Sequence, residues 1–198
     1  MSADGGDLNW TGGGNNSSSI PNVVNIPVGT GPWQSTVVGT HIYVINSNSN
    51  NVSVIDSTNN TIIATIPVGN QPSRSTAVGN YLYIVNFRSD NVSVINTTNN
   101  TVIATIPVGH YPMRLTAVGN YLYVSNDGSN NMSVISTTNN AVIATIPMGG
   151  NPIYSIAIGN YLYVNNEGLN SISVINTANN TITATVPVGN FPSRSTVV

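Results

Sequence analysis

The sequence contains no cysteine, which excludes disulfide bonds and metal sites built from thiolates. No uninterrupted apolar run approaches the roughly 20 residues that a membrane-spanning helix needs. The first ten residues include neither a basic segment nor an apolar one, so no signal peptide is recognisable. We therefore predict no membrane span, while the absence of cysteine by itself leaves the compartment undecided.

Charge is also scarce. Charged residues make up 5% of the chain, against about 25% in ordinary globular domains. Lysine is absent, the four basic residues are arginines, and the formal net charge is −2. Proteins that bind DNA or RNA need clustered lysine and arginine side chains. We therefore predict no nucleic-acid partner, and solubility must depend on neutral Asn, Ser, Thr and Gly.

What the sequence does contain is a repeat of 40 residues without insertions. The motif Ile-Pro-Val-Gly at 66–69 recurs, with small changes, at 26–29, 106–109, 146–149 and 186–189. A second motif, Gly-Asn-Tyr-Leu-Tyr at 79–83, recurs at 119–123 and 159–163, with a diverged copy at 39–43. A constant period of this length indicates a repeat architecture.

Each unit divides into four short strands separated by turn signals. In the second unit we predict strands at about 74–78, 81–86, 91–96 and 101–108. Four antiparallel strands in 40 residues are typical of one blade of a β-propeller. The strand at 81–86 is apolar on both faces, so each blade must pack between two neighbours. We predict an all-β chain: a β-propeller with four complete blades at 20–198, after a flexible Gly/Asn/Ser-rich tail at 1–19.

The second strand of each unit carries a further family signature. The segments Tyr-Val-Ser-Asn at 123–126 and Tyr-Val-Asn-Asn at 163–166 resemble the YVTN family of β-propeller repeats, with variants at 83–86 and 43–46. The resemblance covers about residues 20–198 and implies a propeller. Family members include archaeal and bacterial surface-layer proteins, and the shared motif carries no catalytic residues.

The ends of the chain do not complete a fifth blade. Residues 20–28 resemble the fourth strand of a blade, and residues 193–198 resemble the first strand. These two strands are not neighbours within a blade. A four-bladed ring with two spare strands, a fragment of a longer propeller, and strands donated between molecules are all consistent with this pattern. We favour the last two, because unpaired strand edges promote association between molecules.

One position near the start of each unit suggests a ligand site. It follows the conserved proline by two residues and opens the innermost strand, so its side chains could line the central channel. The residues there are Gln34, Arg74, Arg114, Tyr154 and Arg194. A ring of guanidinium groups could bind carboxylate or phosphate groups, although each arginine could equally satisfy a nearby backbone carbonyl. The variable loops between units add Tyr111 and Phe191, which could stack on sugar rings.

Asn-X-Ser/Thr acceptor sequences for N-glycosylation are frequent. The candidates within the repeats are Asn51, Asn59, Asn91, Asn96, Asn99, Asn131 and Asn179. Such sequences also arise by chance where Asn serves turns and Ser and Thr serve strands. Glycans would nevertheless supply hydration to a chain that has little charge.

Catalytic patterns are missing. The two histidines, His41 and His110, occupy different positions in the repeat, and we expect neither an acid nor a nucleophile near His110, which lies in a loop. The segment 127–130 resembles part of a calcium loop but has too few oxygen ligands. No paired carboxylates, metal-ligand spacing or phosphate loop is present. We therefore predict no cofactor, no metal and no enzymatic activity.

These observations favour a structural protein that is extracellular or lies at a cell or virion surface. Its blades would self-assemble into a filament or layer, with other copies of the chain and glycans as its partners. A propeller module that binds carbohydrate or an anionic ligand is the first alternative. A fragment of a larger propeller enzyme is the second.

Overall fold

The structure is a computed structural model that describes residues 24–195. It consists of four sheets of four antiparallel strands, here called blades 1 to 4. Blade 1 comprises β1 (Pro32–Val38), β2 (His41–Asn46), β3 (Asn51–Asp56) and β4 (Thr61–Pro67). Blade 2 comprises β5 (Pro72–Val78), β6 (Tyr81–Asn86), β7 (Asn91–Asn96) and β8 (Thr101–Pro107). Blade 3 comprises β9 (Pro112–Val118), β10 (Tyr121–Asn126), β11 (Asn131–Ser136) and β12 (Ala141–Pro147). Blade 4 comprises β13 (Pro152–Ile158), β14 (Tyr161–Asn166), β15 (Ser171–Asn176) and β16 (Thr181–Pro187), with a short 3₁₀ helix η1 (Glu167–Leu169) between β14 and β15.

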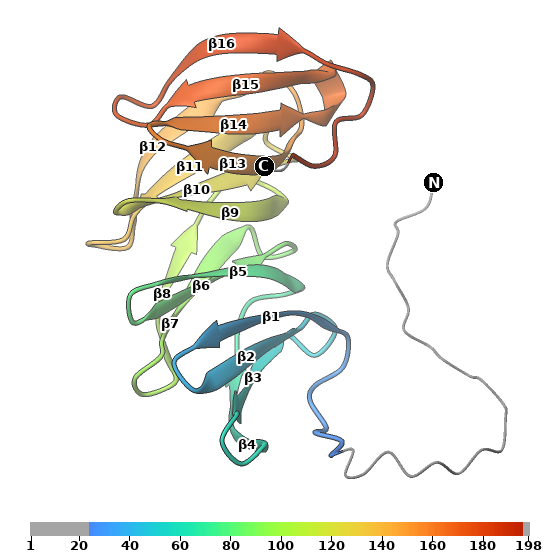
Figure 1. The fold of residues 1–198 in the computed structure, drawn as a ribbon, viewed down its shortest axis with the longest axis vertical. Coiled ribbons are helices and arrows are strands. Elements are labelled where there is room, and N and C mark those ends of the chain that lie inside the picture. The colour runs from blue at the N-terminus through green and yellow to red at the C-terminus, as the bar shows by residue number, and fades with distance from the viewer. Residues whose placement is uncertain (1–23, 196–198) are drawn as a thin grey trace, which may run out of the picture.

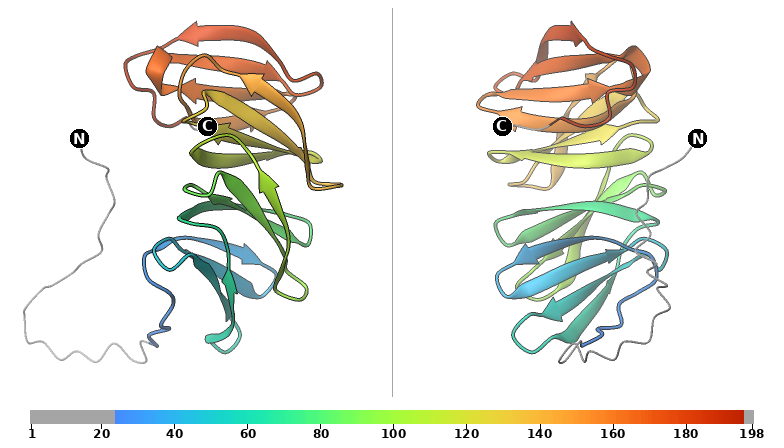
Figure 2. Two further views of the ribbon diagram at one scale, coloured as in Figure 1. Left: turned by 180° about the vertical axis from the view of Figure 1, so that it is seen from behind. Right: turned by 45° about the vertical axis from the view of Figure 1, so that its right-hand side comes forward.

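The blades are arranged as an open fan (Figures 1 and 2). Within each blade the strands pair in chain order, from the first to the fourth. The first strands of consecutive blades, β1, β5, β9 and β13, pack against one another and so lie nearest the axis of the fan. The predicted all-β propeller architecture with four complete blades is confirmed.

Local sequence explains where each strand ends. Gly79 in the first turn of blade 2 has φ +55°, and Asn100 in its last turn has φ +56°. These are left-handed conformations that glycine and asparagine adopt most readily. Pro72 opens β5 and Pro107 closes β8, at strand ends where the missing N–H interrupts little of the ladder. Strands β6 and β7 have the predicted bounds, and β5 begins two residues earlier than predicted.

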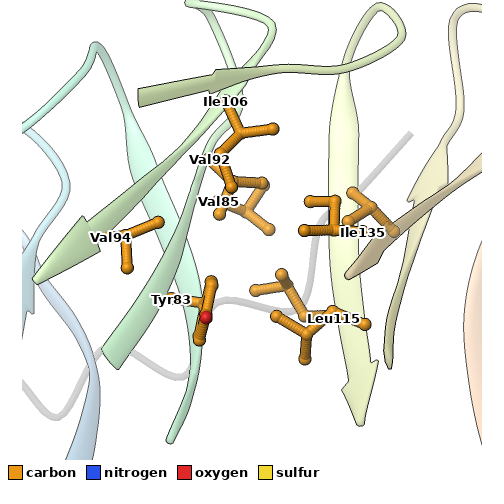
Figure 3. Close-up of a cluster of buried hydrophobic side chains, with 9 residues drawn as sticks. Tyr83, Val85, Val92, Val94, Ile106, Leu115 and Ile135 are labelled. Atoms are coloured by element: carbon orange, nitrogen blue, oxygen red, sulfur yellow. The ribbon is translucent and has the colours of Figure 1, made fainter. Parts of the chain in front are cut away.

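The core lies between blades rather than within them. Each blade has a tyrosine face, which carries the second tyrosine of the Tyr-Leu-Tyr motif, and a leucine face, which carries the leucine of that motif. On the tyrosine face of blade 2, Tyr83, Val85 and Val92 pack against Leu115 and Leu122 on the leucine face of blade 3. Figure 3 shows this cluster, in which side chains of the two blades meet. The equivalent contact joins blades 1 and 2, and again blades 3 and 4.

A buried tyrosine hydroxyl bonds each pair of blades as well. Tyr83 Oη donates to Asn140 Oδ1 at 2.8 Å, across the contact between blades 2 and 3. The repeats on either side place Tyr43 on Asn100 and Tyr123 on Asn180, each at 2.7 Å. Burial raises the pKa of Tyr83 above its ordinary value, so this hydroxyl stays protonated and remains a donor at neutral pH.

The two end segments are unpaired, as expected, but their described parts are not strands. Residues 24–29 and 193–195 have no ladder partner and no strand conformation. A strand is held by hydrogen bonds to a neighbour, and no second strand is present beside either segment. The predicted tail at 1–19, the start of the predicted strand at 20–28 and the last three residues of 193–198 lie outside the described residues.

The interblade hydrogen bond leads to a stability prediction. Tyr83→Phe should lower the free energy of unfolding by about 1 kcal/mol, because it removes the hydrogen bond from a buried hydroxyl to the half-buried Asn140. The matched control is Tyr161→Phe, since Tyr161 is 42% exposed and this change should have no measurable effect. Chemical denaturation followed by circular dichroism provides both values. Equal stability of the two variants would show that the Tyr83–Asn140 bond contributes nothing.

Candidate functional site

The five positions proposed for a ligand site lie along the inner edge of the fan. Gln34, Arg74, Arg114 and Tyr154 occupy β1, β5, β9 and β13. Arg194 follows β16 and is exposed. The structure brings the last three of these residues together around one aromatic ring, whereas Gln34 has a different role.

Tyr154 is the centre of this group. The guanidinium carbon of Arg114 lies 3.9 Å from the centroid of the Tyr154 ring, and that of Arg194 lies 6.0 Å from it. Arg114 Nη2 also donates to Tyr154 Oη at 3.3 Å. The Arg114 Nε is buried and has no hydrogen-bond partner among the described residues. A cation stacked on an aromatic face is stabilised, but this arrangement leaves one N–H of the guanidinium unsatisfied.

Arg74 extends the group toward blade 1. Its guanidinium carbon lies 5.6 Å from the Trp33 ring, and its Nη1 donates weakly to the Ser73 carbonyl at 3.4 Å. Gln34, by contrast, is fully engaged in joining blades 1 and 2. The Ser75 N–H donates to Gln34 Oε1 at 2.9 Å, and Gln34 Nε2 donates to the Ser75 carbonyl at 3.5 Å.

The arginines are close enough to repel one another. Burial lowers the pKa of Arg74 from its ordinary value, and the charges of Arg114 and Arg194 lower it further. Burial also lowers the pKa of Arg114; Tyr154 opposes that shift and Arg194 adds to it. No carboxylate forms an ion pair with any of the three within residues 24–195. We call Arg74, Arg114 and Arg194, with Tyr154 at their centre, the arginine cluster.

The loop aromatics lie elsewhere. Tyr111 and Phe191 occupy equivalent loops between blades, with φ of +52° and +53°. Tyr111 stacks on Phe87 with ring centroids 5.1 Å apart, and Arg88 lies over both rings. Phe191 is 71% exposed. No described contact joins the two loops, so they do not form one platform for a sugar.

Two features of these loops were missed by sequence reasoning. His110 Nδ1 lies 2.7 Å from Asp90 Oδ2, so the expectation that no acid lies near His110 is wrong. The two residues are 20 positions apart and meet because the loop between blades folds over the neighbouring hairpin. Arg88 Nε donates to Gln71 Oε1 at 3.1 Å. Arg88 and Gln71 border a shallow pocket of about 390 Å³, which is completed by Ser47, Asn48, Asn50 and Asn70.

The glycosylation candidates fall into two groups. Asn51, Asn91 and Asn131 are half-buried, and each accepts a hydrogen bond from the buried Asn at the end of the preceding strand, at 2.7–2.8 Å. The others lie in or beside the outer turns: Asn59, Asn99 and Asn179 are exposed, and Asn96 is half-buried. The second group can carry a glycan without loss of a buried contact.

Among residues 24–195, no three side chains of His, Asp or Glu gather as ligands for a metal ion. Asp127, in the segment that resembles a calcium loop, accepts a hydrogen bond from Asn151 Nδ2 at 2.8 Å. No described helix has the length and apolar character needed to cross a bilayer.

Neither a protein-family model nor a curated protein matches the sequence. Solved structures of β-propeller proteins are similar in fold. Hydrazine synthase from Kuenenia stuttgartiensis superposes with a TM-score of 0.72 at 23% identity, over 84% of this chain and 52% of that one. The dihydro-heme d1 dehydrogenase NirN gives 0.74 at 12% identity, over 85% and 40%. BamB from Moraxella catarrhalis gives 0.67 at 15% identity, over 85% and 52%.

These likenesses show that the chain is a propeller module, and it spans about half the length of the chains it resembles or less. They also correct one prediction. Hydrazine synthase and NirN are enzymes that contain propellers, so the prediction of no enzymatic activity, which was drawn from the missing catalytic patterns, is contradicted. The resemblance to YVTN repeats is unconfirmed at the level of the family.

The hydrogen-bonded pair of His110 and Asp90 leads to a prediction about a pKa. The hydrogen bond from His110 is the main cause that lowers the pKa of Asp90 below its ordinary value. In His110→Ala the pKa of Asp90 should therefore rise toward the ordinary value, as measured by NMR titration of the carboxyl carbon. Because the pKa of Asp90 is lower in the folded protein than its ordinary value, the ionised carboxylate stabilises the loop at pH values above that ordinary pKa. This stabilisation is lost as the pH falls through the lowered pKa. An unchanged Asp90 pKa in the variant would contradict the assignment.

Proposed function

We propose that this chain is a binding module that takes an anionic ligand at the arginine cluster. The observation that supports it is positive charge without a nearby negative charge. Three arginines lie close enough to affect one another, and none has a carboxylate partner within the described residues. Like charges that approach one another lower the stability of the fold unless a counter-charge joins them. A bound anion would supply that counter-charge.

The geometry favours a ligand with at least two acidic groups. Arg114 and Arg74 come from adjacent inner strands, β9 and β5, so their guanidinium groups lie on different blades. The Arg114 Nε is buried and unpaired, and a planar guanidinium matches the two oxygens of a carboxylate or phosphate. Tyr154 would hold the Arg114 plane in place from one side. Phosphates and small polycarboxylates have the chemistry that fits this arrangement.

Titration calorimetry with inorganic phosphate and with citrate tests the proposal. We expect the wild-type protein to bind at least one of these anions, with an affinity that falls as salt is added. Arg114→Ala should weaken binding at least tenfold, because it removes a partly buried cation that has no carboxylate partner within the described residues. Arg114→Lys should recover only part of the affinity, since lysine keeps the charge but lacks the planar fork.

Arg88→Ala is the matched control. Arg88 lies in the turn between β6 and β7, where Gln71 and two aromatic rings contact it, so its loss should leave anion affinity unchanged. Thermal unfolding of each variant identifies any loss of binding that results from misfolding. Equal affinity in the wild-type protein and in a variant with both Arg74→Ala and Arg114→Ala, or no binding at millimolar anion, would overturn the proposal.

A self-assembling structural protein, extracellular or at a cell or virion surface, is the second candidate function. The low charge and the repeats support it, and so do the uncovered faces of the two end blades. Val186 on blade 4 is 47% exposed, whereas the equivalent Ile146 on blade 3 is 5% exposed. A free end blade of this kind can associate with other molecules.

This candidate predicts where glycans attach in protein isolated from its source. Peptide mapping by mass spectrometry should find them on the exposed outer turns, at Asn59, Asn99 and Asn179. Asn51 serves as the internal control, because its side chain is half-buried and packed against Asn46, which leaves less room for a glycan. Unmodified peptides at all of these positions would remove glycosylation from the proposal.

A further inference from the structure

The contact between consecutive blades is built in the same way three times. The tyrosine face of one blade supplies a tyrosine and four other buried apolar side chains, and the leucine face of the next blade covers them. The tyrosine also donates across the contact to an asparagine 57 residues further on. Because the repeat is regular, both halves of this contact are also present at the two ends of the fan.

Blade 4 ends the fan with an uncovered tyrosine face. Val186 is 47% exposed there, although Ile66, Ile106 and Ile146 at the equivalent positions of the other blades are 4–5% exposed. Tyr163 and Ile172 are half-buried on this face, whereas their equivalents in blades 1 to 3 are buried. The face carries the apolar side chains of an internal contact, and no blade within residues 24–195 covers them.

Blade 1 begins the fan with an uncovered leucine face. Ile42 and Val44 are half-buried, whereas the equivalent Leu82 and Ile84 of blade 2 are fully buried. Asn60, which corresponds to the asparagines that accept the tyrosine hydroxyl in blades 2 to 4, is exposed. This face therefore offers the second half of the same contact, including its hydrogen-bond acceptor.

We propose that a second copy of this chain occupies these faces, with the leucine face of its blade 1 packed on the tyrosine face of blade 4. Ile42 and Val44 would then cover Tyr163, Ile172 and Val186. Tyr163 would donate to Asn60 of the second copy, in the same way that Tyr123 donates to Asn180 within the chain. The inference deepens the second candidate function and is argued from the apolar faces alone, although displacement of residues 193–195 would move Arg194 away from Tyr154.

The segment after β16 competes with this contact. Ser195 Oγ donates to Asn165 Oδ1 at 2.7 Å, so the segment lies over the inner edge of the tyrosine face of blade 4. Ser195 is there the counterpart of Leu115, which packs beside Val85 between blades 2 and 3. A second copy would bring its own Ser35 to this place and displace residues 193–195. The displaced segment loses few contacts, while the incoming blade covers a whole apolar face.

The two faces differ, so the contact is heterologous. Such contacts close into a ring when the rotation between copies fits and otherwise continue as an open filament. Association through faces also differs from exchange of end strands, because it leaves every blade built from its own chain.

The experiment measures the mass of the full chain by sedimentation velocity across a concentration series. We expect dimers or larger species to form as the concentration rises. Val44→Asp and Val186→Asp each place a charge in one half of the contact, and each alone should abolish rings and filaments. The control is Ile143→Asp, because Ile143 is 49% exposed on the outer strand of an internal blade and should not affect association.

A mixture of the two variants gives the sharpest test. Val44→Asp retains an intact tyrosine face on blade 4, and Val186→Asp retains an intact leucine face on blade 1. An equimolar mixture should therefore form a pair of one copy of each, and nothing larger. Differential labelling of the two variants shows whether each pair contains both.

Ser195→Ala tests the competing segment. Loss of its hydrogen bond to Asn165 should tighten association by about fivefold, on the scale of one net hydrogen bond.

A wild-type chain that remains a monomer at millimolar concentration would overturn the proposal. Dimers that persist in both single variants would also overturn it, because association would then use another surface. Neither result would alter anion binding at the arginine cluster.

Discussion

Burial of both faces of every blade is the constraint on which the rest of this structure depends. The apolar side chains of a blade point both ways, so a single blade cannot cover them, and the contact between blades becomes the unit of stability. Tyr83, Val85 and Val92 are completely buried only because blade 3 lies over them. The fan is therefore a row of nearly identical contacts, and its two ends are the places where that requirement is unmet.

The same regularity explains why the fold could be predicted from the sequence. Turn residues recur every 40 positions, and each has a local cause that a single chain reveals: a left-handed Gly79, a left-handed Asn100, a proline at a strand end. The second and third strands of blade 2 were placed correctly because the hairpin signals on both sides of them are strong. The end segments were not, because strand conformation at 193–195 depends on a partner strand that the local sequence does not contain.

The candidate sites were less accessible to sequence reasoning, because they depend on distances between repeats. The period showed that the positions of Arg74, Arg114 and Tyr154 fall on inner strands. It could not show that Arg114 stacks on Tyr154 while Gln34 bonds to the backbone of blade 2. The pair His110–Asp90 was missed for the same reason. The repeat predicts where a position lies, and the side chain at that position decides what it contacts.

Two kinds of deviation from the repeat therefore carry the functional argument. The first is substitution at a constant position, such as arginine or tyrosine on the inner strands, which places charge without a counter-charge near the axis. The second is a position whose residue is ordinary but whose surroundings are not, such as Val186, whose counterparts in blades 1 to 3 are buried. An apolar residue retained at an uncovered end keeps an unfavourable contact with water. That cost disappears once a blade of matching shape covers the face, and the opposite end of the same chain carries such a blade.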